Sequence, residues 1–120
     1  MNNKPKYHLF KNTKYALEGL IHAFKTESSF RLELVLSIFV FIMIYIIEIG
    51  LLYKFVLVIT AFLILIIELL NSAVENVVDL VTKEIHPLAK SAKDIGATAV
   101  MFSIILHLIC WLIIINKYYI

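Results

Sequence analysis

The sequence predicts an all-α membrane protein with an N-terminal amphipathic surface helix followed by three transmembrane helices. Hydrophobic residues make up 62% of the 120 residues, whereas soluble domains contain roughly 45–50%. The apolar residues form three stretches long enough to cross a bilayer, which takes about 20 residues. The chain is too short to hold a soluble domain beside a membrane domain. We therefore expect a single integral-membrane domain over residues 1–120.

Residues 7–26 are expected to form the surface helix. Phe10, Leu17, Ile21 and Phe24 fall on one side of a helix, and the lysines of this segment lie largely elsewhere. A helix of this kind lies in the membrane interface, with its lysines among anionic headgroups. An ordinary amphipathic helix packed against the bundle is a compatible interpretation.

The three spans are expected at residues 32–49, 51–81 and 97–115. The second is longer than a bilayer requires, so its polar end should emerge into the headgroup zone. Gly50 marks the first turn, and Pro87 marks the break after the second span because proline cannot continue a helix interior. Three helices leave much of their surface facing lipid, so we expect a homo-oligomer.

Basic residues orient this bundle. Six precede the first span, one lies between spans one and two, three lie between spans two and three, and one follows the third span. They are Lys4, Lys6, Lys11, Lys14, Lys25, Arg31, Lys54, Lys83, Lys90, Lys93 and Lys117. The positive-inside rule then predicts a cytoplasmic N-terminus and an outside C-terminus.

A polar stripe interrupts the second span. Its five members stand at positions i, i+3, i+4, i+7 and i+11 and share one helical face: Glu68, Asn71, Ser72, Glu75 and Asp79. A carboxylate inside hydrocarbon costs roughly 2.5–3.5 kcal/mol at mid-bilayer on insertion scales, so such residues are commonly functional. A helix–helix seam held by hydrogen bonds would explain Asn71 and Ser72. It would not explain three carboxylates on one face, because like charges repel unless a cation or proton lies among them.

The charge bias gathers chemically useful groups at the cytoplasmic face. Glu27 and Glu75 carry oxygen ligands that suit Mg²⁺, which usually takes one or two carboxylates together with substrate phosphates. Lys93 is a point charge suited to phosphate. Glu68 lies deeper and suits a general base. Together they indicate phosphoryl transfer from a soluble donor to a lipid hydroxyl. With three glycines in the chain, neither a Walker A loop nor a kinase glycine-rich loop is present.

The segment ELLNSAVENVVDLVTKEIHPLAKSAKDIGATAV resembles the signature of the small prokaryotic integral-membrane diacylglycerol kinases, a family that includes undecaprenol kinases. The signature reads E-x-x-N-[ST]-A-[IV]-E-x-x-V-D, followed by a histidine and an A-K-x-x-A-K-D block. The resemblance covers nearly the whole chain. It implies a homotrimer of three-span chains with active sites shared between subunits, MgATP as phosphate donor, and a bacterial inner membrane location with a periplasmic C-terminus. It implies no nucleic-acid partner.

The resemblance also implies roles for single residues. Glu68 is similar to the catalytic base, and Asn71 and Asp79 to residues that support the active site. Glu27 and Glu75 match the Mg²⁺ ligands. The implied ATP contacts are His8, Tyr15, Glu27, Glu75, Glu84, Ile85, His86, Lys93 and Asp94. The implied lipid contacts are Glu68, Ala97, Ser29, Phe30, Arg31, Glu33, Lys54 and Trp111. His8 stands where some members have arginine. Ala97 stands where some have serine, with Thr98 next to it.

We expect diacylglycerol as the lipid, with undecaprenol as the alternative. The short chain and Trp111 favour diacylglycerol, whereas the HPLAK segment also resembles the polyprenol branch. A different class is a small proton- or ion-conducting membrane protein in which Glu68 and His107 form a relay. For His107 an interhelical hydrogen bond is the favoured interpretation. A third alternative is a purely structural bundle.

Overall fold

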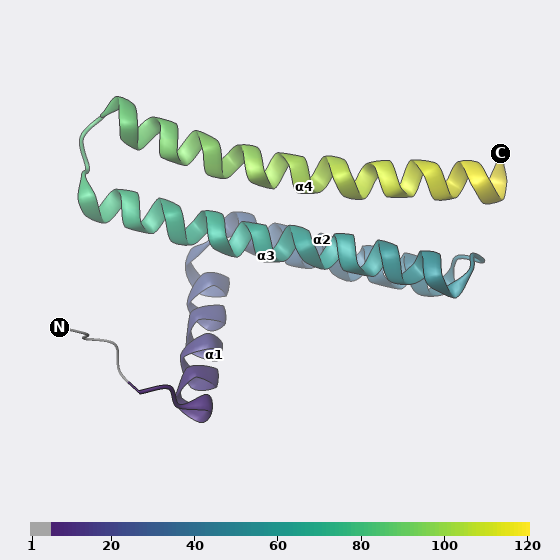
Figure 1. Cartoon of the computed structure of the whole chain (residues 1–120), viewed down its shortest axis with the longest axis horizontal. Helices are drawn as coiled ribbons and strands as arrows, with labels where there is room; N and C mark the ends of the chain where they lie inside the picture. Colours follow the sequence, from purple (N-terminus) through teal and green to yellow (C-terminus); the bar gives the residue numbers. More distant parts are fainter. Residues whose placement is uncertain (1–5) are drawn as a thin grey trace.

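The computed structural model describes residues 6–120, which form four α-helices and no β-strand. The helices are α1 (Leu9–Thr26), α2 (Ser28–Ile46), α3 (Leu51–Val81) and α4 (Pro87–Tyr119). Figure 1 shows α2, α3 and α4 running along the same long axis, while α1 stands across them. The last three helices are each long and apolar enough to cross a membrane. The predicted all-α fold with three membrane helices is therefore confirmed.

The surface helix α1 begins at Leu9, two residues later than the expected 7–26, and ends where predicted. Glu27 alone joins it to α2, in an extended conformation with φ −106° and ψ 101°. Arg31 fastens this sharp corner, because its Nη1 donates to the carbonyl oxygens of Phe24 (2.9 Å) and Lys25 (3.0 Å). Those carbonyls belong to the last turn of α1, where no helical N–H can reach them. The guanidinium thus caps α1 from the first turn of α2.

Helix α2 begins and ends earlier than the expected 32–49. It begins at Ser28 because Glu27 acts as its N-cap residue, with the Glu27 carbonyl accepting from Arg31 N at 3.1 Å. It ends at Ile46, and a short turn leads to Gly50, the N-cap residue of α3. Lys54 Nζ donates to Tyr45 O at 2.9 Å and so satisfies a carbonyl at the end of α2. Lys54 therefore holds the turn between these two helices.

Helix α3 covers the predicted range 51–81, but α4 begins at Pro87, ten residues before the expected 97. Proline suits the first turn of a helix because its missing N–H has no partner there. The His86 side chain completes the cap, since Nδ1 accepts from Leu88 N at 3.1 Å. With 33 residues, α4 is about 50 Å long at 1.5 Å per residue. That exceeds the roughly 30 Å hydrocarbon core, so polar turns extend beyond the apolar part.

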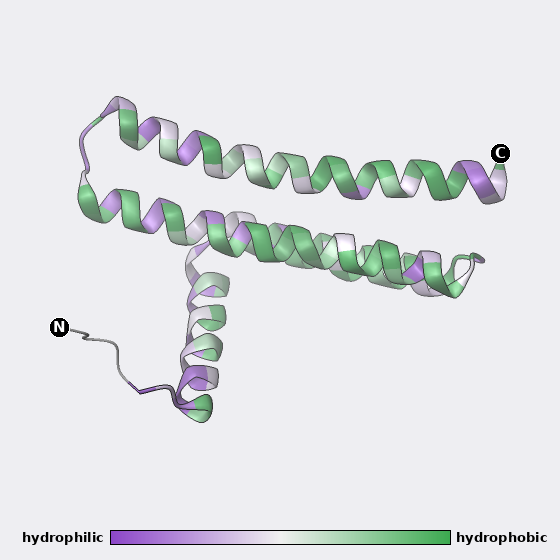
Figure 2. Cartoon of the chain, in the orientation of Figure 1, coloured by the Kyte–Doolittle hydropathy of each residue, from purple (hydrophilic) through white to green (hydrophobic). Residues whose placement is uncertain are grey.

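Two clusters of buried apolar side chains hold the helices together. Ala23, Phe30 and Leu65 join α1, α2 and α3. Ile44, Leu57 and Ile114 join α2, α3 and α4 near the opposite end. Most other apolar side chains of the long helices are exposed in the single chain, and Figure 2 shows hydrophobic residues dominating their middle portions. Such a surface suits lipid or neighbouring subunits.

The C-terminal end of α4 is tied to the α2–α3 turn. Gly50 N donates to Tyr118 Oη at 3.1 Å, and Tyr119 Oη donates to Glu48 O at 3.1 Å. Both contacts satisfy backbone groups that the turn leaves unpaired. The helices are therefore held together at the end furthest from the polar part of α3.

Candidate active site

The polar stripe on α3 passes from buried to exposed. Glu68, Asn71 and Ser72 are 5%, 8% and 5% exposed, Glu75 is half-buried and Asp79 is exposed. Burial falls in this order because the stripe starts where α3 packs between α2 and α4, and ends on the polar turns of α3. The stripe thus connects the interior of the bundle with its surface.

Asn71 links the stripe to α4 and to Glu75. Its Nδ2 donates to Glu75 Oε1 at 3.2 Å, one helical turn away. Its buried Oδ1 lies directly against Gly96, where any Cβ atom would overlap with it. Gly96 was not predicted as a site residue, because the need for a missing side chain depends on which helix lies opposite. The close approach fixes the Asn71 amide between α3 and α4.

Two further carboxylates lie near Glu68 at the polar end of the bundle. Glu68 lies close enough to Glu75 and Glu27 for both to act electrostatically on it. Glu75 reaches the group from α3, whereas Glu27 is placed by the corner that Arg31 holds. Convergent carboxylates of this kind attract a cation or retain a proton.

The oxygen donors suit a hard divalent cation such as Mg²⁺. Among residues 6–120, no group of three or more His, Cys, Asp or Glu side chains is arranged to hold a metal ion by itself. Glu27 and Glu75 supply two carboxylates. This matches the chemistry of Mg²⁺ sites that take one or two protein carboxylates and complete their shell with water and phosphate oxygens.

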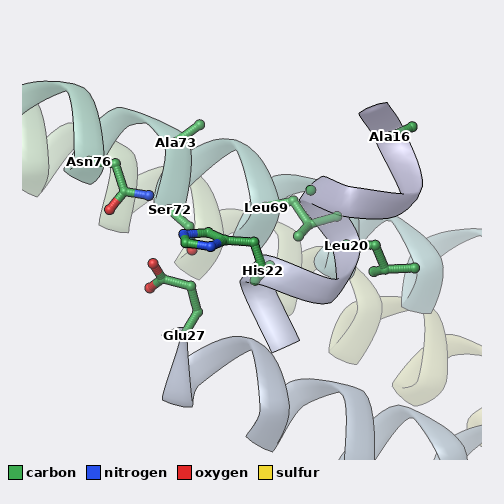
Figure 3. Close-up of a pocket in the computed structure, with 10 residues that line it drawn as sticks. Ala16, Leu20, His22, Glu27, Leu69, Ser72, Ala73 and Asn76 are labelled. Atoms are coloured by element: carbon green, nitrogen blue, oxygen red, sulfur yellow. The ribbon is translucent and has the colours of Figure 1, made fainter. Parts of the chain in front are cut away.

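A pocket of about 310 Å³ lies between α1 and α3, beside these carboxylates. Figure 3 shows His22, Glu27, Ser72 and Asn76 around the same space, with small and aliphatic residues of both helices completing the wall. Ser72 Oγ is buried and has no hydrogen-bond partner within residues 6–120. An orphaned buried hydroxyl facing a pocket is a group that a polar ligand can satisfy. His22 and Asn76 were not predicted to lie here.

A second pocket, of about 270 Å³, lies where the α3–α4 loop meets both helices. It contains three of the implied ATP contacts from the loop, Glu84, Ile85 and His86, together with Lys93 and Asp79. Lys93 Nζ donates to Asp79 Oδ1 at 2.7 Å, so an ion pair bridges α3 and α4. Asp94 pairs with Lys90 one turn away on α4. Three lysines, Lys83, Lys90 and Lys93, line this pocket and make it the basic side of the site.

Two implied ATP contacts lie elsewhere in the single chain. His8 and Tyr15 share a pocket of about 190 Å³ at the exposed beginning of α1. Twelve residues of helix separate Tyr15 from Glu27, which corresponds to about 18 Å along the axis. In Figure 1 this end of α1 points away from α3 and α4.

The implied lipid contacts are also spread along the chain. Phe30 is 2% exposed and belongs to the cluster with Ala23 and Leu65, while Ser29 and Ala97 are exposed. Glu33 lies close enough to Glu68 to act on it electrostatically. Lys54 precedes Glu68 by fourteen residues of α3, about 21 Å along the axis. Arg31 is occupied by the α1 cap.

His107 makes the interhelical hydrogen bond that sequence analysis favoured. Its Nδ1 lies 2.7 Å from Thr60 Oγ1 on α3, and its Nε2 accepts from Trp111 Nε1 at 2.9 Å. Both ring nitrogens are therefore occupied. Because the Trp111 indole N–H donates to His107 on the same helix, it is not available to lipid headgroups.

Comparisons with known proteins all match the same family. Residues 14–115 match the family model described as prokaryotic diacylglycerol kinase. The diacylglycerol kinase of Haemophilus influenzae is 36% identical over 104 residues, covering 87% of this chain and 88% of that protein. That of Pseudomonas aeruginosa is 34% identical over 99 residues, covering 82% and 80%. That of Escherichia coli K12 is 32% identical over 111 residues, covering 92% and 91%.

Proposed function

The chain belongs to the prokaryotic diacylglycerol kinase family, and we propose that it transfers the γ-phosphate of MgATP to the hydroxyl of diacylglycerol, giving phosphatidic acid and ADP. The observation that carries the proposal is the proximity of Glu27 and Glu75 to Glu68 at the polar end of the bundle. It joins a metal-binding pair at the surface to a carboxylate within the membrane helices. A kinase for a lipid substrate needs these two elements side by side.

Glu68 is the general base in this proposal. The lipid hydroxyl oxygen attacks the γ-phosphorus while its proton passes to a Glu68 carboxylate oxygen. The bond between the γ-phosphorus and the bridging oxygen of ATP breaks, and ADP leaves. Glu68 is 5% exposed, which keeps bulk water away from this step and limits hydrolysis of ATP.

Glu27 and Glu75 would hold the magnesium ion, whose charge offsets that of the phosphate oxygens. Asn71 orients the Glu75 carboxylate through its 3.2 Å hydrogen bond. Lys93 and the 84–86 loop would receive the nucleotide phosphates, because they bring a cation and exposed backbone to one pocket. Lys93 then exchanges Asp79 for phosphate as its partner.

A homotrimer with shared active sites completes the proposal. Tyr15 lies about 18 Å from Glu27 along the α1 axis, and His8 lies further away still, at the beginning of the helix. A nucleotide on Lys93 of one subunit would therefore meet the α1 residues of a neighbour. The exposed apolar faces of α2, α3 and α4 support such packing. We place the N-terminus and the 82–86 loop in the cytoplasm and the C-terminus in the periplasm of the bacterial inner membrane.

The test uses purified protein in mixed micelles with labelled ATP, Mg²⁺ and either diacylglycerol or undecaprenol. We expect label in phosphatidic acid. Label in undecaprenyl phosphate alone would show that the phosphate acceptor is a polyprenol. No label in either lipid would refute the proposed lipid kinase function. Glu68→Gln should abolish turnover while ATP still binds. Glu48→Gln, at the exposed α2–α3 turn, is the matched control and should retain turnover.

A further inference from the structure

A cavity of about 360 Å³ lies between α2, α3 and α4, outside the pockets described above. We call it the inter-helix groove. On α2 it extends from Glu33 to Met43, on α3 from Ala61 to Leu65, and on α4 it includes His107. Ten residues of α2 correspond to about 15 Å. That is half of the roughly 30 Å hydrocarbon core, the depth of one leaflet.

Beyond Glu33, the wall of the groove offers no free side-chain hydrogen-bonding group among the described residues. Its lining is aliphatic or aromatic apart from Glu33, Ser37 and His107. Ser37 Oγ donates back to Leu34 O at 2.7 Å, and both nitrogens of His107 are occupied. The part of a ligand that contacts this wall is therefore expected to be hydrocarbon.

One end of the groove differs from the rest. Glu33 Oε2 is buried and has no hydrogen-bond partner among the described residues, and Glu33 lies close to Glu68. Buried acceptors of this kind are normally satisfied. The groove therefore has a polar end that adjoins the proposed general base, and an apolar remainder that leads away from it.

At the opposite end, beside Ala61, His107 takes part in a directed chain of hydrogen bonds. The indole of Trp111 can only donate, so His107 Nε2 must be an acceptor, and the proton of the neutral ring lies on Nδ1. Nδ1 then donates to Thr60 Oγ1 at 2.7 Å, and Thr60 Oγ1 donates to Val56 O at 2.9 Å. Every donor has a defined partner, so the imidazole is locked in one orientation between α3 and α4.

Close packing lies beyond the imidazole. Leu57, Ile44 and Ile114 are 0%, 2% and 3% exposed, and Trp111 packs against them. Val40 lines the groove and packs against the same cluster. A chain that enters from Glu33 therefore meets His107 and then this cluster.

We propose that the inter-helix groove holds one hydrocarbon chain of the lipid alcohol and that the His107–Thr60–Trp111 hydrogen-bond chain sets the length it accepts. The hydroxyl end lies between Glu33 and Glu68, and the terminal methyl group reaches His107. His107 acts as a specificity-determining residue and Thr60 as a positioning residue. This inference rests on the proposed lipid kinase function.

The test compares kcat/KM for diacylglycerols of short, intermediate and long saturated chains. His107→Ala removes the end of the groove, so the ratio of long-chain to short-chain kcat/KM should rise by about tenfold or more, the scale on which hydrophobic pockets discriminate size. Thr60→Val leaves the groove lining unchanged but frees the imidazole, and should raise the same ratio by a smaller factor. Leu106→Ala, on the part of α4 outside the groove, should leave it unchanged.

A second measurement needs no variant. Wild-type protein is irradiated with a diacylglycerol that carries a diazirine at one chain terminus, and the labelled peptides are identified. We expect label within residues 40–43 and 104–108. Two results would overturn this inference but leave the proposed kinase function intact. One is normal wild-type turnover together with unaltered chain-length preference in both variants. The other is label confined to segments outside the groove. A lack of turnover with every diacylglycerol would instead refute the proposed function.

Discussion

Gly96 on α4 lies directly against the side-chain amide of Asn71 on α3, so closely that a Cβ atom at position 96 would overlap with Asn71 Oδ1. Asn71 is 8% exposed, and its Nδ2 donates to Glu75 at 3.2 Å. The amide is thus held between a helix backbone on one side and a carboxylate on the other. The position of Glu75 in the proposed metal site therefore depends on the absence of a side chain on another helix.

Gly96→Ala should impair both stability and activity. The added methyl group must displace Asn71 or separate α3 from α4, and overpacking of this kind costs about 1–3 kcal/mol. We expect a lower Tm in detergent and a fall in kcat for diacylglycerol phosphorylation. Gly19→Ala is the control for stability, because no atom lies within 4 Å of its added Cβ and alanine is favoured in helices by roughly 0.5–1 kcal/mol. Unchanged Tm and kcat in Gly96→Ala would contradict the packing argument.

Asn71→Ala should weaken the response to magnesium. Glu75 would lose its hydrogen bond, and a bond to a charged group contributes about 1.5–3 kcal/mol, or about tenfold or more in an equilibrium constant. We expect the Mg²⁺ concentration for half-maximal rate to rise by that factor at saturating ATP. Asn116→Ala, near the exposed end of α4, should show the wild-type Mg²⁺ dependence. A variant with lower kcat but unaltered Mg²⁺ dependence would assign Asn71 a purely structural role.

Periodicity explains why much of this fold can be predicted. The apolar runs locate three membrane helices, and the spacing of Glu68, Asn71, Ser72 and Glu75 places them on one face. The sequence pattern does not predict structural features that depend on contacts between residues distant in sequence. Pro87 begins α4 as well as ending the preceding segment, because His86 caps the new helix.

The same reason applies within the site. Nothing in the sequence around Gly96 indicates that Asn71 lies opposite, and His22 enters the pocket between α1 and α3 only because the corner at Glu27 turns α1 across the bundle. Arg31 is a similar case. Its charge is apparent from the sequence, but its hydrogen bonds to the carbonyls of Phe24 and Lys25 depend on that corner. Residue roles that rest on helix–helix geometry need the three-dimensional structure.

Arg31→Ala should loosen the surface helix. The guanidinium satisfies two carbonyls in the last turn of α1, and hydrogen bonds from a charged donor contribute about 1.5–3 kcal/mol. We expect faster hydrogen exchange of the amides in the C-terminal half of α1, measured by mass spectrometry in micelles, with exchange in α4 unchanged. Lys25→Ala is the control, because its side chain is exposed and takes no part in this cap. Equal exchange in wild type and Arg31→Ala would show that the cap does not hold the corner.

The ion pair between Lys93 and Asp79 should matter for nucleotide binding more than for stability. Its side chains are 41% and 53% exposed, and exposed ion pairs contribute little to stability because solvent screens them. Lys93→Met should therefore change Tm little. If Lys93 binds phosphate, the loss of this charge-assisted contact should raise the KM for ATP by roughly tenfold or more.

Asp79→Asn separates the two roles of the pair, because it breaks the ion pair but retains the lysine charge. We expect its KM for ATP to stay much closer to the wild-type value than that of Lys93→Met. Lys117→Met, at the opposite end of α4, controls for the loss of one positive charge. Raised salt should increase the wild-type KM and have less effect on Lys93→Met, since screening acts on the interaction that this variant lacks. Equal loss of Tm in both pair variants, with KM unchanged, would show that Lys93 only joins α3 to α4.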